Sequence, residues 1–470
     1  MKTGKKVFAL LCTAGILAAS LSGCTGKKYD TPTLSSQELT FSAENESDLK
    51  KVTDGKLSTG ITLSAGKSME IDLGGEKTFD QIVLREKGDN LNKFSISVQK
   101  GGKWEKVYEG DRILEYRLCY IGEVTADKVR ITAEDCIEPV ELSEVQVRMS
   151  VSPERETKVS QYICFDAHFD EMAARNDNSF SGYYNVVTDA IIIGTVTLDE
   201  KGNVIIADGE EKFAERMEAF RKAIGENGTR IWVTVGFDMK DAEGNRDHDA
   251  TAKFVNENIE AITANIKAFT EKYGIYGVDY DWEYPEKSFQ WKAYDKIITE
   301  TAKVTKVSIA LPPWGIKLSD EAVEVLEHVN VMAYDLFDER GDHANSFVAG
   351  WDAIRNVMKS GIPAEKILLG VPTYGRTTDK SGDAWPSYKD YDLGKWGNLI
   401  KDYPYTTADG EKKTCDAYVN SYGQVRDKTA LAMSSGIGGI MIFREGCDSD
   451  YTEQYCLHRA AEEVIEAAGK

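Results

Sequence analysis

From about residue 162 onward, short apolar runs alternate with longer amphipathic ones. The apolar runs lack the apolar–polar alternation of half-exposed strands, which is typical of parallel strands covered on both faces. We predict strands at residues 162–166, 190–197, 230–236, 277–283, 307–311, 329–334, 367–371 and 438–443. We predict helices between them at residues 210–224, 254–273, 294–304, 351–359 and 425–433. This order favours an α/β fold, a (β/α)₈ TIM barrel over residues 152–470, because a doubly wound open sheet, the alternative, usually has fewer strands.

Residues 39–151 have a different pattern. Short runs of β-forming residues occur at 68–73, 81–84, 94–99, 103–108, 128–132 and 144–151, divided by Gly, Asp and Lys, without a convincing helix. This pattern predicts an all-β sandwich domain. Because the chemical motifs all lie beyond it, we expect residues 152–470 to fold and act without it.

The first residues have the features of a targeting segment. Lys2, Lys5 and Lys6 precede an apolar run over residues 7–19, which is too short to span a bilayer comfortably. We therefore predict a signal peptide at 1–23, followed by a polar tether at 24–38.

Composition narrows the function classes. The chain has 57 Lys and Arg against 78 Asp and Glu, a formal net charge of −21, which argues against nucleic acid and anionic lipid surfaces as partners. Its five histidines have no metal-ligand spacing and no nucleotide loop is present, so neither a metal nor a cofactor is expected. Beyond Cys12 and Cys24 there are six cysteines: Cys119, Cys136, Cys164, Cys415, Cys447 and Cys456. Local disulfides, 119 with 136 or 447 with 456, and free buried thiols are equally open for them.

The most informative segment is the predicted strand at 277–283. Asp279, Asp281 and Glu283 alternate with bulky residues, so all three acids point to one side of the strand. Neighbouring acids lie about 6–7 Å apart, and at that spacing at least one carboxyl is expected to keep its proton near neutral pH. A retained proton is what a general acid needs. An exposed acidic strand and a divalent-cation loop are the alternatives, but the bulky flanks and the spacing fit them poorly.

This segment resembles the Asp-x-x-Asp-x-Asp-x-Glu signature of glycoside hydrolase family 18, although Tyr276 replaces the first Asp. Further strand ends resemble the family: the Met-x-Tyr-Asp motif at 332–335, the run at 369–376 and the run at 438–443. Two positions differ from the family. The third strand has Thr-Val-Gly-Phe at 234–237 where the family commonly has Ser-x-Gly-Gly, and Phe443 stands where a Trp is usual.

The resemblance implies substrate-assisted retaining hydrolysis. Glu283 would protonate the glycosidic oxygen, and Asp281 would hold the 2-acetamido group of the substrate. Asp279 would tune Asp281, and Tyr334 would donate its hydroxyl to the acetamido oxygen. We expect Trp385 and Trp396 to be packing residues, and substrate binding is expected at Met332, Asp335, Trp314, Tyr374, Arg376 and Phe443.

The implied partner is an N-acetylglucosamine-containing oligo- or polysaccharide, cut at β-1,4 bonds as in a chitinase. Chitin oligosaccharides, N-glycan cores and peptidoglycan all contain that unit. An endo-β-N-acetylglucosaminidase acting on N-glycans, or a non-catalytic glycan-binding protein on the same barrel, are the alternatives. No cofactor is implied.

Two further resemblances concern the N-terminal part. Residues 21–24, Leu-Ser-Gly-Cys, resemble a bacterial lipobox, in which Cys24 would carry the lipid anchor on the extracytoplasmic face of the membrane. Segments around 52–55, 69–74, 94–98 and 142–145 resemble a factor-five/eight type C (discoidin-like) domain. Such a domain would bind sugar or serve as a spacer, and no residue role is transferred to it.

Overall fold

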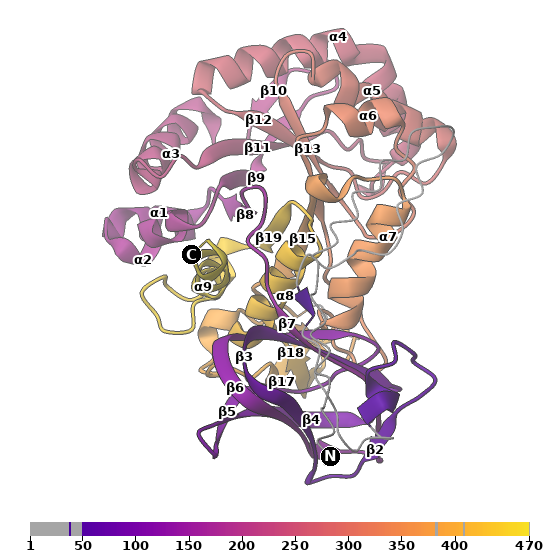
Figure 1. Ribbon diagram of the computed structural model, residues 1–470. Helices are drawn as coiled ribbons and strands as arrows, with labels where there is room; N and C mark the ends of the chain where they lie inside the picture. The colour runs from indigo at the N-terminus through magenta and orange to yellow at the C-terminus, as the bar shows by residue number, and fades with distance from the viewer. Residues whose placement is uncertain (1–36, 39–48, 381–383, 408, 470) are drawn as a thin grey trace, which may run out of the picture.

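A closed parallel barrel forms the larger part of the molecule (Figure 1). The computed structural model describes residues 37–38, 49–380, 384–407 and 409–469. The last barrel strand pairs with the first, which itself pairs with the second, so the sheet closes and the open-sheet alternative is excluded. The barrel strands are β8 (Lys158–Cys164), β9 (Asp189–Leu198), β11 (Arg230–Gly236), β12 (Gly277–Asp281), β13 (Lys306–Leu311), β14 (His328–Val331), β15 (Ile367–Pro372) and β19 (Gly439–Phe443). All eight predicted strands are confirmed.

Helices surround the barrel. They are α1 (Ala167–Arg175), α2 (Asn178–Ser181), α3 (Gly209–Ile224), α4 (His248–Tyr273), α5 (Ser288–Thr301), α6 (Asp320–Val325), α7 (Ala353–Lys359), α8 (Tyr422–Ser434) and α9 (Leu457–Ala468). Helix α4 begins six residues before its predicted start, because its first turn is polar and is set by a cap: the Asp247 carboxylate accepts a hydrogen bond from Ala250 N. No helix in the described ranges is both long enough and apolar enough to cross a bilayer.

Two small antiparallel additions accompany the barrel. Strand β10 (Val204–Ile206) forms a hairpin with β9. Strands β16 (Arg376–Thr377), β17 (Leu399–Thr406) and β18 (Lys412–Tyr418) make a three-stranded sheet inserted between β15 and α8.

Strand β12 has two chemically different faces, as its period-2 pattern predicts. Tyr280 and Trp282 point outward into the layer between barrel and helices. The Tyr280 hydroxyl lies 2.8 Å from Thr301 Oγ1 on α5, and Trp282 Nε1 donates to His248 Nδ1 on α4 at 2.8 Å. Asp279, the residue before Tyr280, therefore points into the barrel, where it meets side chains from four other strands.

The N-terminal sheet, residues 37–38 and 61–149, has seven strands. They are β1 (Gln37–Glu38), β2 (Ile61–Leu63), β3 (Lys67–Lys87), β4 (Leu91–Lys100), β5 (Lys103–Gly110), β6 (Arg117–Cys136) and β7 (Val140–Met149). The predicted runs 68–73 and 81–84 are one long strand, β3, with two shifts of register against β6. Both halves of β3 contribute to a single apolar core, so the sheet folds around that core. Its first strand lies at the end of the predicted tether.

This sheet is packed against the barrel, chiefly through β6 and α8 (Figure 1). Val83, Tyr116, Leu118 and Tyr120 of the sheet belong to the apolar core of the barrel. The Tyr116 ring stacks on that of Trp351 at 4.2 Å. Every residue of α8 is buried, on all faces of the helix. We call this contact the interface; it speaks against our expectation that residues 152–470 fold alone.

Charged side chains are also buried in the interface. The Asp427 carboxylate on α8 accepts hydrogen bonds from the Tyr108 hydroxyl (2.5 Å), Tyr120 N (2.8 Å) and Arg117 Nη2 (3.5 Å). Arg117 Nη1 also donates to Asp111 Oδ1 at 2.5 Å. The three contacts of Asp427 join residues more than 300 positions apart in the chain.

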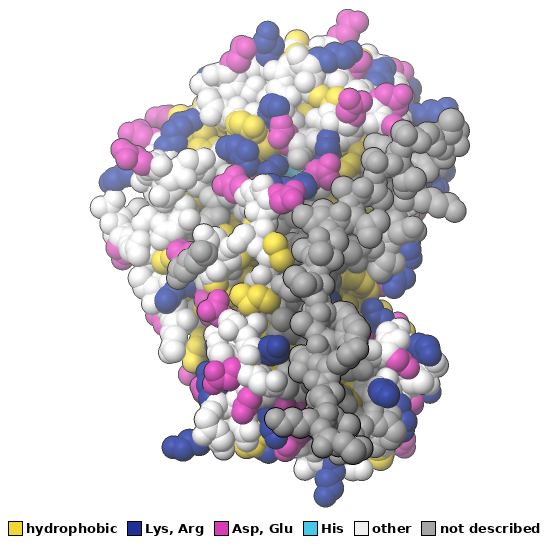
Figure 2. All heavy atoms as spheres, in the orientation of Figure 1, with side chains coloured by type: hydrophobic (Ala, Val, Ile, Leu, Met, Phe, Trp, Pro, Cys, Tyr) yellow, Lys and Arg dark blue, Asp and Glu magenta, His cyan; other side chains and the backbone are white. Residues whose placement is uncertain are grey.

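Several expectations concern single residues. The six cysteines of the described ranges are free thiols, and Cys119 and Cys136 lie on the same strand, β6. The signal peptide and Cys24 lie outside the described residues. On the face shown in Figure 2, Lys and Arg side chains are interspersed with Asp and Glu and form no continuous basic patch.

Candidate active site

The centre of the site is Asp279, which is fully buried inside the barrel. Its Oδ2 accepts hydrogen bonds from Tyr162 Oη (2.9 Å) and Thr234 Oγ1 (3.1 Å). Its Oδ1 accepts from Ser308 Oγ (2.7 Å) and Asn330 Nδ2 (3.2 Å). Burial raises the pKa of Asp279, and these hydrogen bonds oppose the rise. Four strands therefore hold this carboxyl in one fixed position.

Asp281, two residues further along the strand, has a different environment. Its Oδ1 is buried and has no hydrogen-bond partner within the described residues. Burial raises the pKa of Asp281 well above its usual value, and the charges of Glu283 and Asp279 raise it further. This carboxyl is consequently poised to hold a proton or to receive a ligand's donor.

Glu283 follows at the mouth of the barrel, with 31% of its side chain exposed. Its Oε1 lies 3.3 Å from Arg246 Nη2, and its carbonyl oxygen accepts from Arg246 Nη1 at 2.9 Å. Arg246 Nε also lies 3.5 Å from Asp238 Oδ2. No sequence motif marks Arg246, because it lies in the loop between β11 and α4.

Tyr334, just beyond β14, faces the same acids. Burial raises its pKa well above the usual value, and Asp281, Asp335 and Glu283 add to the rise. Gly370 makes room for the ring, since a Cβ there would lie 3.0 Å from Tyr334 Cε1 and 2.2 Å from Val331 O. The structure therefore brings Tyr334 close to the acids of the β12 strand.

An aromatic group surrounds these polar atoms. Phe443 at the end of β19 stacks on Tyr334, with ring centroids 5.6 Å apart, and lies 5.6 Å from the Tyr162 ring and 6.2 Å from the Tyr374 ring. A ring of this size provides an apolar platform for the apolar face of a sugar.

Asp335 is held in place from three sides. Its Oδ1 lies 3.0 Å from His343 Nδ1 and accepts from the Tyr374 hydroxyl at 3.1 Å. Its Oδ2 accepts from Arg376 Nη1 at 3.4 Å. Its φ of 57° is in the left-handed region, which Asp tolerates better than most residues. The structure thus brings Asp335, Tyr374 and Arg376 together.

The remaining predicted positions are arranged more loosely. Met332 is half-buried beside this group, and Trp314 is 55% exposed in the loop after β13. Trp385, expected to be a packing residue, is 44% exposed and lies against the Tyr374 ring at 4.5 Å and the Arg376 guanidinium at 4.0 Å. Trp396 does pack: its ring lies 4.7 Å from that of Tyr108 across the interface.

The sequence analysis also missed the four side chains that hold Asp279. A signal existed for two of them: Ser308 and Asn330 are isolated polar residues inside apolar strands. A polar residue in the middle of a buried strand needs a partner, and in a barrel that partner can lie on a neighbouring strand.

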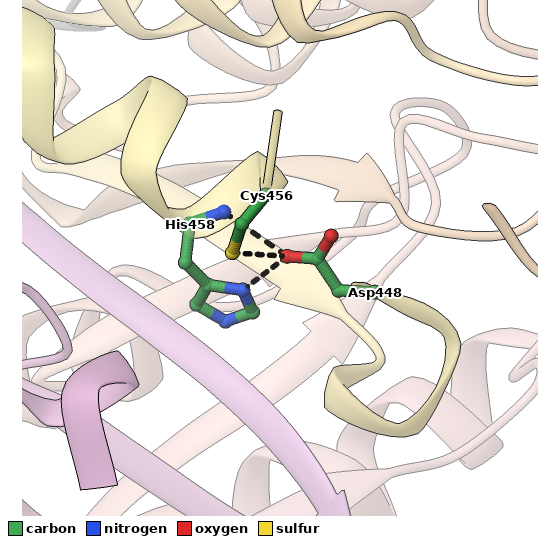
Figure 3. Close-up of side chains that lie close together, drawn as sticks. All are labelled: Asp448, Cys456 and His458. Atoms are coloured by element: carbon green, nitrogen blue, oxygen red, sulfur yellow. Dashed lines mark hydrogen bonds and ion pairs between the residues drawn. The ribbon is translucent and has the colours of Figure 1, made fainter. Parts of the chain in front are cut away.

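One other group of ligand-type side chains lies among the described residues, namely Asp448, Cys456 and His458 (Figure 3). Both Asp448 oxygens are already occupied. Oδ1 accepts from Leu457 N (3.0 Å) and Ser449 N (2.8 Å), and Oδ2 accepts from His458 N (3.1 Å) and lies 2.6 Å from His458 Nδ1. Burial raises the pKa of Cys456, which keeps its thiol neutral. The group therefore anchors the start of α9, where the positive end of the helix disfavours a cation.

Part of the chain is similar in sequence to known chitinases. Endochitinase 1 of Metarhizium robertsii is 25% identical over 224 residues, which is 37% of this chain and 53% of that protein. Chitinase 1 of Aphanocladium album is 28% identical over 179 residues, or 32% of this chain and 42% of that protein. The chain thus spans about half the length of the curated relatives it matches.

Solved structures share the barrel fold. A family 18 chitinase from Flavobacterium johnsoniae matches with a TM-score of 0.51 at 20% identity, covering 66% of this chain and 94% of that one. A chitinase from Bacteroides thetaiotaomicron matches with a TM-score of 0.52 at 14% identity, covering 67% and 98%. The family model of glycosyl hydrolases family 18 matches residues 172–448. Since that segment is more than half of the chain and contains the acidic strand, the chain belongs to glycosyl hydrolases family 18.

Proposed function

We propose that the barrel hydrolyses β-1,4 glycosidic bonds next to N-acetylglucosamine, as a chitinase does, with retention and with the substrate's acetamido group as nucleophile. The observation that carries this proposal is the neighbouring pair Asp281 and Tyr334. The buried Oδ1 of Asp281 has no partner in the described residues, and the Asp281 charge is near enough to Tyr334 to raise the pKa of its hydroxyl. A buried polar group without a partner is costly, so Asp281 Oδ1 is best explained by a ligand that satisfies it.

An N-acetyl group fits this pair of atoms. The acetamido N–H would donate to Asp281, and the Tyr334 hydroxyl would donate to the acetamido oxygen, which orients that oxygen toward the anomeric carbon. The attack forms a bond from the acetamido oxygen to the anomeric carbon while the bond to the leaving oxygen breaks. Asp281 then balances the positive charge of the oxazolinium ion.

Glu283 would protonate the leaving oxygen. It lies at the mouth of the barrel and is partly exposed, so it is accessible to the bond between two sugars. The buried Asp279, held by four hydrogen bonds, keeps its neighbour in position and raises the pKa of Asp281. Phe443 would support the sugar ring, and Asp335, Trp314, Met332, Tyr374 and Arg376 would contact it around the mouth.

The relatives' names support chitin-type substrates, and a class V chitinase of Nicotiana tobaccum with the same fold was solved in complex with NAG4. The decisive experiment compares 4-nitrophenyl glycosides of N,N′-diacetylchitobiose and cellobiose. We expect cleavage of the first only, because the glucose units lack the acetamido nucleophile. Equal rates on both would contradict substrate assistance, and a high-mannose glycoprotein tests the endo-β-N-acetylglucosaminidase alternative.

We further propose that the chain is a lipoprotein anchored through Cys24, with a discoidin-like domain at its N-terminus. The support is the order of basic residues, apolar run and Leu-Ser-Gly-Cys in the sequence. Cys24→Ala should prevent acylation and release the protein from membranes, which fractionation of bacterial cells would measure. A variant that is normally processed and stays membrane-bound would contradict the anchor.

A further inference from the structure

The loop between β14 and the next helical turn, residues 336–345, is organised around one carboxylate. Asp338 Oδ1 accepts from Arg340 N (2.9 Å) and Asp342 N (3.1 Å), and Asp338 N donates to Asp342 O at 3.1 Å. The loop closes where Leu336 N donates to His343 O at 3.0 Å. The position of Asp338 therefore determines the position of the whole loop.

The far end of this loop contacts the candidate active site. His343, fully buried, lies with its Nδ1 3.0 Å from Asp335 Oδ1 and 3.3 Å from Asp335 N. Asp335 directly follows Tyr334, and its backbone is in the restricted left-handed region. A displacement of His343 would consequently release Asp335 and, with it, the peptide that carries the Tyr334 ring.

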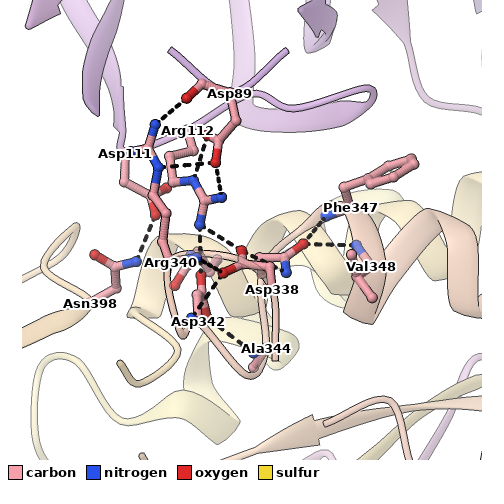
Figure 4. A network of polar contacts seen from close by, with 12 residues as sticks. Asp89, Asp111, Arg112, Asp338, Arg340, Asp342, Ala344, Phe347, Val348 and Asn398 are labelled. Atoms are coloured by element: carbon pink, nitrogen blue, oxygen red, sulfur yellow. Dashed lines mark hydrogen bonds and ion pairs between the residues drawn. The ribbon is translucent and has the colours of Figure 1, made fainter. Parts of the chain in front are cut away.

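The near end of the loop is held by the N-terminal sheet (Figure 4). Arg112, in the turn between β5 and β6, donates from Nη1 to Asp338 Oδ2 at 2.7 Å. The same guanidinium donates two hydrogen bonds to the Asp89 carboxylate, at 2.9 Å and 2.5 Å. In the other direction, Arg340 of the loop lies with Nε 2.9 Å from Asp89 Oδ2 and donates to Asn92 Oδ1 at 2.9 Å.

The contact between Arg112 and Asp338 is shielded from water. The Arg112 side chain is 4% exposed and that of Asp338 is 11% exposed. Charge-assisted hydrogen bonds of this kind are strong and directional, and removal of Arg112 would leave Asp338 Oδ2 with the neutral donor Asn345 Nδ2, at 3.2 Å, in place of a charged partner. A series of contacts therefore connects the two parts of the molecule rigidly. It runs from Arg112 through Asp338 and the loop to His343 and Asp335.

We propose that Arg112 of the N-terminal sheet is a positioning residue for Asp335 and Tyr334, so that the sheet completes the substrate-binding face of the barrel. This inference rests on the proposed function and adds that the site is built from both parts of the chain. A misplacement of about 1 Å can cost on the order of a hundredfold in rate, so the connection matters for activity as well as for stability.

The test compares Arg112→Met with Gln81→Leu in the full chain. Gln81 also crosses the interface, where its side chain contacts Ser434 Oγ at 3.0 Å on α8, but it does not touch the loop. The measurements are kcat and KM on chitotetraose below the melting temperature, and amide hydrogen exchange of residues 335–345. Arg112→Lys, which keeps the charge, serves as a rescue variant.

We expect Arg112→Met to lower kcat/KM at least tenfold and to speed exchange in the loop. Gln81→Leu should leave both within about twofold, even if its melting temperature falls equally, and Arg112→Lys should recover part of the activity. Unchanged kcat/KM in Arg112→Met, or an equal loss in Gln81→Leu, would overturn the inference. Absence of hydrolysis by the unaltered chain would instead contradict the proposed function, while loop exchange would still decide whether Arg112 holds the loop.

Discussion

The acidic residues of the barrel and the interface with the N-terminal sheet both withdraw carboxyl groups from water, but they offer them different partners. In the interface, the Arg117 guanidinium prevails over burial and lowers the pKa of Asp111, whereas at Asp427 burial prevails and raises the pKa to about 6. In the barrel, burial also raises the pKa of Asp281, and the nearby acids Glu283 and Asp279 add to the rise.

The difference is one of available partners. Asp427 in the interface accepts three hydrogen bonds from the N-terminal sheet, whereas Asp281 Oδ1 accepts none from the described residues. A buried charge that is paired holds two parts of a protein in register, and a buried acid without a partner is available for chemistry. Substitutions in the two regions should therefore have separable effects on stability and on activity.

The largest difference between the effect on activity and the effect on stability is expected from Glu283→Gln. It keeps the shape of the side chain and most of its hydrogen bonding but cannot deliver a proton, so kcat on chitotetraose should fall about 10²–10⁴-fold. The melting temperature should stay within a few degrees of the unaltered chain. Near-normal turnover would remove Glu283 as the acid.

Asp281→Asn should lower kcat about tenfold to a hundredfold, because the amide cannot balance the positive charge of the oxazolinium ion. It should also leave stability unchanged or raise it slightly, since it removes an acid that burial disfavours. Kinetics and differential scanning calorimetry on one sample measure both. A loss of stability equal to that of an interface variant would break the distinction between the two regions.

The reciprocal variant is Arg117→Met in the interface. Removing the guanidinium takes away the ion pairs of the buried Asp111 and Asp427 and leaves them only neutral hydrogen-bond donors, which should cost about 3–5 kcal/mol of unfolding free energy. Denaturant titration measures this, and Lys128→Met, at an exposed ion pair with Asp72, is the matched control with little expected effect. Deleting residues 1–151 should be more damaging still, because it also exposes α8.

The smallest effect concerns pH. Arg246 opposes the rise in the pKa of Asp281, so Arg246→Ala should raise that pKa further. The reaction needs a proton within the acidic group, and activity is lost as the pH rises through that pKa. The alkaline limb of the kcat/KM profile should therefore move to higher pH in Arg246→Ala. A shift to lower pH would show that Arg246 acts mainly on the substrate.

Much of the barrel could be predicted from local pattern. A uniformly apolar run indicates a strand that is buried on both faces, and an amphipathic run indicates a helix that is buried on one. The alternation of the two along the chain therefore predicts a parallel barrel. The alternation in β12 was sufficient to place three acids on one face, and the motif at 332–335 was sufficient to add Tyr334 and Asp335. The N-terminal strands were less clear, because β3 bends and changes register where its pattern breaks.

Other features depended on the tertiary structure. The four donors to Asp279 come from strands that are up to 117 positions away, and only the register of the closed barrel aligns them. Arg246 and His343 lie in loops without a repeating pattern, and Arg112 reaches Asp338 across 226 positions. The choice of residues for chemistry and the strand face they occupy follow from the sequence, since a strand's alternation is local. The pairing of charges does not, because it depends on which groups long-range packing brings within about 3 Å of one another.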